Sequence, residues 1–414
     1  MKNEVEVRGQ RSERWCRASR FPCRPFAAAL GVVLTLITCP AGAQQRDTVR
    51  ADTTRPFVRG GVYDKPYQTR LLGRTAIGGY AEAHARYEKV DGITDEAGFE
   101  AKRFNIFTST RVSDFVRMAA ELEFEEGGKE VKLEYAAIDV RIHPALTLRG
   151  GMLLSPLGRF NLSHDSPLNE FTDRPLVSTE ILGVALSEPG FGILGQMPAG
   201  RQGRVTWEAY LTNGFHDGLI TSSPEGTRIP LGRGNTEDQN SSPAFVGRLA
   251  WSPSIGFEFG LSGHHGAWNV FSVDGTVVDD RRDLTLGVFD GEVTVAGIRV
   301  SGEAALARAE IPPGLRGTYA SRQAGWYVDL ARDFGSGWIP TAPGSTFTVK
   351  ARIDAIDLDT DAVGHHVRQA GAGLNFRPTS ESVIKLEMVR GWSFDPFNNR
   401  SDFVRLLASF ATYF

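Results

Sequence analysis

Residues 405–414 read RLLASFATYF and end the sequence on an aromatic residue. Side chains on a β-strand alternate between its two faces, so the apolar residues of this stretch share one face. That face carries Val404, Leu406, Ala408, Phe410, Thr412 and Phe414, while Arg405, Ser409 and Tyr413 lie on the other. A strand with this pattern can pack against the core of a soluble protein, or it can close a β-barrel in a membrane. The sequence before residue 405 distinguishes these two alternatives.

The first 43 residues have the organisation of an export signal. Seven basic residues precede the apolar stretch FAAALGVVLTLIT (Phe26–Thr38), and AGA (Ala41–Ala43) offers a cleavage site between small residues. The apolar stretch is too short to span a bilayer. We therefore expect residues 1–43 to be a signal peptide and residues 44–74, which have no hydrophobic period, to be a flexible segment. The alternative, a lipoprotein anchor at Cys39, lacks the small residue expected before the cysteine.

Composition excludes several kinds of protein. All three cysteines lie in the leader, so the rest of the chain has no thiol, disulfide or thiolate metal site. The leader holds 7 of the 46 basic and 3 of the 49 acidic residues, which leaves 39 and 46 and a net charge of −7. This negative charge argues against nucleic acid as a partner. No apolar run of 18 residues follows the leader, and helix-period patterns are scarce, so the sequence predicts an all-β chain.

From Thr75 onward, charged and apolar residues alternate in one segment after another. In VRMAAELEFEE (Val116–Glu126), for example, Met118 and Leu122 alternate with Arg117, Glu121 and Glu123. Sixteen such segments can be counted, near residues 75–87, 102–112, 115–126, 130–142, 145–154, 189–197, 203–213, 243–253, 255–266, 283–290, 292–308, 318–333, 344–356, 366–377, 382–391 and 401–414.

This pattern predicts a transmembrane antiparallel β-barrel of about 16 strands over residues 75–414. In hydrocarbon every backbone N–H and C=O group needs a partner, and a sheet closed on itself supplies one. The outer face of such a sheet must be apolar, whereas its inner face tolerates charge. Tight turns that contain proline alternate with long polar stretches, as in outer-membrane barrels.

Five stretches occur in a fixed order along the chain: IGGYAEAHARY (Ile77–Tyr87), IHPALTLRGGMLLSPLGRFN (Ile142–Asn161), RLAWSP (Arg248–Pro253), LSGHHG (Leu261–Gly266) and GLNFRP (Gly373–Pro378). Together they resemble the phosphate/polyphosphate-selective porin family of Gram-negative outer membranes, over about residues 78–414. The resemblance implies a sixteen-stranded homotrimeric porin that passes phosphate or other anions, with a long loop folded into the pore. The chain end also resembles that of substrates of the barrel assembly machinery, with Phe414 and Phe410 as the assembly signal.

Residues 155–188 are the candidate for the inward-folded constriction loop. They carry the acidic residues Asp165, Glu170, Asp173, Glu180 and Glu188 and the basic residues Arg159 and Arg174, a net charge of −3. Phosphate-selective members of the family are expected to have basic constrictions, and this sequence departs from that pattern. The resemblance therefore implies phosphate, whereas the residues predict weak or cationic selectivity.

Charged side chains expected to point into the lumen form the candidate pore lining. They are Arg103, Arg111, Arg117, Glu121, Glu123, Arg149, Arg204, Arg248, Lys350, Arg352 and Arg405. One interpretation is a track of guanidinium groups along which anions move. The other, which we favour, is that they pair with inward carboxylates, because both signs occupy neighbouring strands.

Histidine pairs invite a metal or catalytic interpretation that the spacing does not support. His264 and His265 are consecutive, and neighbours on a strand point to opposite faces. Ser262 and His264 share a face, but no third catalytic group is evident. We expect no enzyme, metal or cofactor. The predicted function is passive diffusion of ions and small solutes through a porin in the outer-membrane lipid of a Gram-negative bacterium. The alternative is a structural or adhesive barrel, which an apolar, plugged lumen would favour.

Overall fold

The computed structural model describes Lys65 and residues 69–70, 74–222 and 226–414, which all belong to one compact unit, Asp52–Phe414. The expected signal peptide and most of the expected flexible segment lie outside the described residues. Within the described ranges, no helix has the length and apolar character required to cross a membrane.

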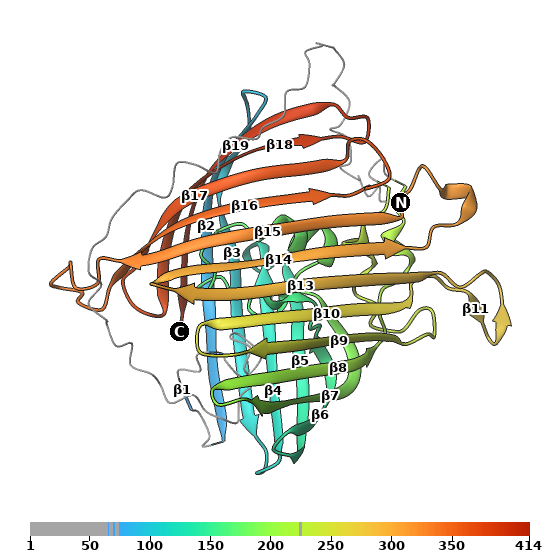
Figure 1. Ribbon diagram of the computed structural model, residues 1–414, viewed down its shortest axis with the longest axis horizontal. Coiled ribbons are helices and arrows are strands. Elements are labelled where there is room, and N and C mark those ends of the chain that lie inside the picture. Colours follow the sequence, from blue (N-terminus) through green and yellow to red (C-terminus); the bar gives the residue numbers. More distant parts are fainter. Residues whose placement is uncertain (1–64, 66–68, 71–73, 223–225) are drawn as a thin grey trace, which may run out of the picture. The chain divides into compact units, whose positions relative to one another are not determined.

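Sixteen long antiparallel strands form one closed sheet (Figure 1), which confirms the predicted barrel. Each strand pairs with the next along the chain, and the last, β19, pairs with the first, β2. The bounds are β2 (Thr75–Val90), β3 (Ile93–Arg111), β4 (Val116–Glu125), β5 (Glu130–His143), β6 (Leu146–Leu154), β7 (Ser187–Ala199), β8 (Gly203–Thr212), β9 (Ala244–Ser252), β10 (Phe257–Ala267), β13 (Asp283–Val295), β14 (Ile298–Ala309), β15 (Arg322–Phe334), β16 (Thr346–Asp357), β17 (His366–Arg377), β18 (Ser382–Phe394) and β19 (Arg400–Tyr413).

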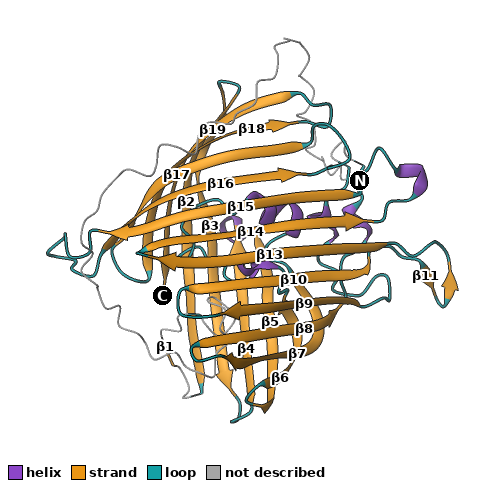
Figure 2. Cartoon of the chain, viewed as in Figure 1, coloured by secondary structure: helices purple, strands orange, loops and turns teal. Residues whose placement is uncertain are grey.

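Short elements decorate this sheet. The two-residue strand β1 (Thr69–Arg70) pairs with β2, and β11 (Ser272–Val273) pairs with β12 (Thr276–Val277) in a loop. The helical turns are η1 (Glu126–Gly128), α1 (Gly158–Leu162), η2 (Ser178–Leu182), η3 (Asp217–Leu219), η4 (Ile229–Gly232) and η5 (Pro313–Leu315). Figure 2 shows helical turns behind β13, β14 and β15, and their contacts described below place α1 and η2 inside the barrel.

The two ends of the barrel differ in their connections. Short turns such as 144–145 and 296–297 lie at the end that holds the carboxyl terminus, while the long connections 155–186, 213–243 and 268–282 lie at the other. Outer-membrane barrels have short periplasmic turns and longer extracellular loops, so we call these the periplasmic end and the extracellular end.

Two hairpin turns differ from the sequence prediction. β3 begins at Ile93, whereas the sequence predicted a start near residue 102. The strand starts earlier because Asp91 and Gly92 form a tight turn, with φ of 51° and 82°. Likewise, Ala296 and Gly297 turn at φ of 51° and 77°, whereas the prediction broke the pair of strands at residue 291. Two consecutive residues with positive φ give the turn twist that suits a two-residue hairpin. The strand predicted from residue 318 begins at Arg322.

The closing strand has the predicted faces. The Phe414 ring lies outside and stacks on Phe104, with ring centroids 5.3 Å apart, and the Phe414 N–H donates to the Gly79 carbonyl at 3.0 Å. A Cβ atom at Gly79 would lie 2.4 Å from the Phe414 ring, so this close approach requires glycine. Tyr413 is buried inside the barrel, where its hydroxyl donates to Asp165 at 3.0 Å. Tyr413 thus lies on the inner face and its neighbour Phe414 on the outer face, as strand alternation predicts.

Phe414→Ala should lower the amount of heat-modifiable barrel in the outer membrane. The substitution removes the stacked ring, an interaction worth roughly 0.5–1.5 kcal/mol beyond burial, at the seam that closes the sheet. Tyr413→Phe is the matched control, because it keeps an aromatic ring at the seam and removes only the internal hydroxyl. Semi-native gel electrophoresis of outer-membrane fractions measures both. Equal barrel levels for Phe414→Ala and wild type would contradict this role of the terminal ring.

Candidate channel constriction

Residues 155–186, which join β6 to β7, run through the barrel interior, and we call them the inner segment. Their backbone N–H groups donate to inward side chains of distant strands. Gly158 donates to Ser262 Oγ on β10 at 2.9 Å and Phe160 to Glu303 on β14 at 2.5 Å. Farther along, Thr172 donates to Glu387 on β18 at 3.0 Å and Leu176 to Asp354 on β16 at 3.2 Å. The inner segment therefore crosses the lumen and touches walls that are far apart in sequence.

One side of the lumen is filled by apolar side chains. The inner segment contributes Phe160, Ile181 and Leu182 to a buried cluster that also contains Phe215 and Leu219 from the connection 213–243. Opposite them, β13 turns Leu284, Leu286 and Val288 inward. Each fully buried side chain of this kind contributes roughly 1.5–3 kcal/mol. This cluster fixes the inner segment against β13 to β15.

Four of the five acidic residues predicted for the constriction loop have basic partners from elsewhere in the chain. Asp165 forms an ion pair with Lys65, and Asp173 with Arg86. Glu170 pairs with Arg299 and, at 3.2 Å, with Arg377, while Glu180 pairs with Arg228 at 2.6 Å. The net charge of −3 counted in sequence therefore does not act as free negative charge in the lumen. The fifth acidic residue, Glu188 on β7, accepts a hydrogen bond from Thr212 Oγ1 at 3.2 Å.

The two arginines of the inner segment are buried beside carboxylates or carbonyls. Arg159 lies 3.0 Å from Glu292 and 3.8 Å from Glu258. Arg174 donates to the Val184 carbonyl at 3.4 Å, and burial together with nearby Arg103 lowers its pKa. Burial would raise the pKa of Glu170, but Arg377 and Arg299 outweigh it and hold that pKa below its usual range. Arg159 and Glu170 thus have specific partners of opposite charge, whereas Nε and Nη2 of Arg174 have no hydrogen-bond partner among the described residues.

Most of the predicted inward arginines and lysines lie against carboxylates of the wall. Arg103 bridges Glu82 at 3.1 Å, Glu123 at 3.3 Å and Glu125 at 3.0 Å. Arg149 binds both oxygens of Asp139 at 2.8 and 2.9 Å.

The same arrangement recurs on other strands of the barrel. Arg248 binds Asp290 at 2.5 Å, and Arg405 binds Glu88 at 2.9 Å. Lys350 pairs with Glu387. The favoured interpretation, pairing across neighbouring strands, therefore describes the geometry better than a free guanidinium track.

The other predicted lining residues occupy different positions. Glu121 is buried and accepts from Asn105 at 2.6 Å and Lys65 at 3.0 Å. Arg111, which pairs with Asp114 at 2.9 Å, is exposed at the periplasmic rim. Arg117 and Arg204 also point inward near that end, and Arg204 donates to Gln196 at 3.1 Å.

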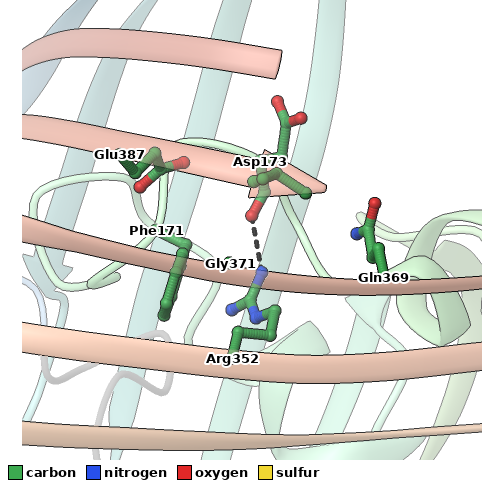
Figure 3. A pocket seen from close by; sticks show the side chains of 7 residues that line it. Phe171, Asp173, Arg352, Gln369, Gly371 and Glu387 are labelled. Carbon is green, nitrogen blue, oxygen red and sulfur yellow. Dashed lines mark hydrogen bonds between the residues drawn. The ribbon is translucent and has the colours of Figure 1, made fainter. Parts of the chain in front are cut away.

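Phe171 of the inner segment lies beside Arg352 of β16 (Figure 3). Its ring lies under the Arg352 guanidinium, 4.3 Å from Cζ to the ring centroid, and under the Lys350 ammonium at 4.6 Å. Arg352 also donates to the Asp173 carbonyl at 2.7 Å and to both oxygens of Asp329 at 2.6 and 2.7 Å. A small cavity remains here, bounded also by Gln369 and Glu387.

Sequence reasoning missed three residues that hold this constriction. Phe171 was not singled out because an aromatic residue in a polar loop carries no periodic signal. Lys385 is fully buried and donates to the carbonyls of Ser166 at 2.9 Å and Phe171 at 3.1 Å. Lys65, in the stretch expected to be a flexible segment, is buried over the Phe107 ring at 4.8 Å. The alternation around Lys385 could have identified it as inward-facing, but its partners could not be foreseen.

The histidine pair of β10 behaves as the strand geometry predicts. His264 is buried in the lumen, with its ring edge-on to Phe215 at 5.1 Å, while His265 is exposed on the outer face and lies 2.9 Å from Thr285 Oγ1. The two rings therefore cannot share one ligand. Over the part of the chain that the structure describes, no group of three His, Cys, Asp or Glu residues is arranged to hold a metal ion.

Comparison with known sequences gives limited information. No family model matches the chain. An uncharacterized protein of Aquifex aeolicus (strain VF5) is 29% identical over 213 residues, which are 49% of this chain and 46% of that protein. The chain thus matches about half the length of this curated relative.

Solved structures share the fold. The outer membrane channel DcaP of Acinetobacter baumannii gives a TM-score of 0.53 at 12% identity, over 84% of this chain and 100% of that one. A loop L8 deletion mutant of OmpT of Vibrio cholerae gives 0.50 at 11%, over 82% and 100%. Salmonella typhi OmpF, in complex with daunomycin, gives 0.50 at 10%, over 84% and 100%. The chain therefore shares the β-barrel fold of these outer-membrane proteins.

His164→Gln should make the stability of the barrel less sensitive to acid. Burial and nearby Arg174 lower the pKa of His164 to about 4, compared with about 6.5 in an unfolded chain. Between these values the unfolded chain binds the proton and the folded chain does not, so the free energy of unfolding falls as pH drops through this window. Thermal unfolding in detergent near pH 7 and pH 5 measures the loss. Equal losses in variant and wild type would show that His164 is not the titrating group.

Proposed function

We propose that this barrel is a passive channel for ions and small hydrophilic solutes, with its constriction between the inner segment and β16 to β19. Two partly exposed charge networks support this proposal, one on each side of Phe171. On the extracellular side, Asp173 contacts Arg86 and lies 3.8 Å from Arg405. On the periplasmic side, Glu170 contacts Arg299 and Arg377. Charged groups that keep some solvent exposure on both sides of a constriction suit a hydrated path.

We further propose weak charge selectivity and no tight phosphate site. A guanidinium binds phosphate through paired N–H groups, but several inward guanidiniums already hold carboxylates in that way. Arg352 binds Asp329 and Arg149 binds Asp139 through two N–H groups each. Opposite charges at short range cancel much of the field that would otherwise separate anions from cations. Assembly as a homotrimer, which the resemblance implies, belongs to the same proposal.

Glu170→Gln should shift the reversal potential in a salt gradient toward anions. The change leaves Arg299 and Arg377 without their shared carboxylate at a narrow point, where fixed charge has the largest effect on passing ions. The shift should fade at high salt as screening shortens its range. Glu180→Gln is the matched control, because its partner Arg228 lies in the connection 213–243. An unchanged reversal potential for Glu170→Gln would remove Glu170 from the conducting path.

A second candidate, a structural barrel with a plugged lumen, is favoured by the buried apolar cluster around Phe160 and Leu286. Planar-bilayer recording separates the two. A passive channel gives discrete conductance steps, and Phe171→Ala should enlarge them because the ring narrows the passage. Phe289→Ala, which removes an exposed ring on the outer face of β13, should leave conductance unchanged. Absence of steps in both wild type and Phe171→Ala would support the structural barrel.

A further inference from the structure

The outer face of the barrel carries three basic side chains near its extracellular end. Lys89 on β2, Arg368 on β17 and Arg390 on β18 are exposed, and their inward neighbours on the same strands are buried or partly buried. We call these three residues the rim patch. Elsewhere the outer face of these strands is dominated by apolar residues such as Leu374, Leu386 and Leu406.

Strand register brings the rim patch together. Lys89 and Arg390 both pair with Val404 of β19, one from each side, so two strand spacings, about 10 Å, separate their backbones. Arg390 pairs with Ala370, which is two residues from Arg368 on the same face. Such diagonal neighbours lie roughly 7–8 Å apart. Long basic side chains at these spacings can contact one anionic group or two adjacent ones.

No carboxylate neutralises the rim patch among the residues that the structure describes. Two outward carboxylates on the neighbouring strands β19 and β16 have other partners: Asp402 accepts from Arg400 at 2.7 Å, and Asp357 accepts from the Asp359 N–H at 3.0 Å. This contrasts with the lumen, where Arg103, Arg248 and Arg352 each bind carboxylates. Three neighbouring like charges repel one another, so the outer face gains stability if the membrane supplies an anion.

Aromatic residues place the rim patch at the membrane interface. Tyr87 lies next to Lys89, whose ammonium is 5.9 Å from the ring centroid. Trp392 is directly opposite Arg368 in the sheet and carries Arg400 over its ring at 5.5 Å. Tyrosine and tryptophan gather where lipid headgroups meet the hydrocarbon. A basic side chain is tolerated at this depth, whereas an arginine at the bilayer centre is costly.

We propose that the rim patch binds phosphate groups on lipid headgroups of the outer leaflet. Arginine binds phosphate oxygens through paired N–H groups, and lysine adds a point charge. The adjacent Tyr87 and Trp392 rings would hold the hydrophobic part of the same lipid. This function lies on the outer wall and is independent of conduction through the lumen.

Binding of purified barrel to lipopolysaccharide, native or enzymatically dephosphorylated, tests the proposal. The double variant Arg368→Gln/Arg390→Gln should bind native lipopolysaccharide roughly tenfold or more weakly, since each basic residue near a charged surface contributes about 1 kcal/mol. The control is Arg332→Gln, which removes an exposed outward arginine at the periplasmic end of β15. It should bind like wild type. Single-channel conductance should be unchanged in the double variant and the control.

Three outcomes would overturn the proposal. Equal binding of native and dephosphorylated lipopolysaccharide would show that phosphate is not recognised. Equal weakening by the control would indicate a general charge effect. Full competition by millimolar inorganic phosphate would point to a free-anion site and not to a lipid site. If the double variant assembles poorly, wild-type binding at increasing salt still decides, because a phosphate contact must weaken as screening grows.

Discussion

Backbone hydrogen bonding in hydrocarbon is the constraint on which this structure depends. A spanning sheet leaves no edge exposed only if its first and last strands pair, and here β19 meets β2 from Tyr413 opposite Tyr80 to Phe403 opposite Val90. Closure of the sheet then determines the polarity of the side chain at each position, because each residue of a strand must face either lipid or lumen. The terminal Phe414 extends the pairing by bonds to Gly79 and covers the seam with its ring.

The lumen satisfies its inward side chains in two different ways. Toward β13 to β15, the inner segment brings apolar residues that the wall covers with Leu284, Leu286 and Val288. Toward β16 to β19, its carbonyls and carboxylates meet lysines and arginines, as when Lys385 binds the Ser166 and Phe171 carbonyls. The apolar side anchors the inner segment, and the charged side gives its polar groups partners on the wall. A single segment is therefore held from two sides by different interactions.

The sequence predicted the barrel well because alternation is a local signal. Each strand repeats it, and even the closing strand has the predicted faces. The positions of the turns were harder to predict. The turns at Asp91–Gly92 and Ala296–Gly297 require positive φ at two residues, but a glycine also occurs at Gly291 inside β13, so glycine alone does not mark a turn.

The constriction could not be predicted to the same degree. Its contacts join residues such as Glu170 and Arg377, which are distant in sequence and meet only after the sheet closes. The apolar cluster was also unexpected. The sequence predicted charged side chains in the lumen, whereas β13 turns apolar residues inward. Counting the charged residues of the loop therefore gave its net charge. It did not give the electric field in the lumen, because that field also depends on the charged residues of the strands that pair with the loop.

The contrast between the two faces of the wall explains the different fates of its arginines. In the lumen a buried guanidinium must be paired, because an isolated charge removed from bulk water is costly, and Arg248 accordingly lies against Asp290 and Glu258. On the outer face near the headgroups, a cation can rely on anions that belong to the membrane. Arg368 and Arg390 fit that second environment, since β17 contains no carboxylate and Glu387, the one carboxylate of β18, points inward to Lys350. The charged side chains of this barrel thus fall into two groups. Those in the lumen have counterions from the protein, and those near the headgroups on the outer face rely on anions of the membrane.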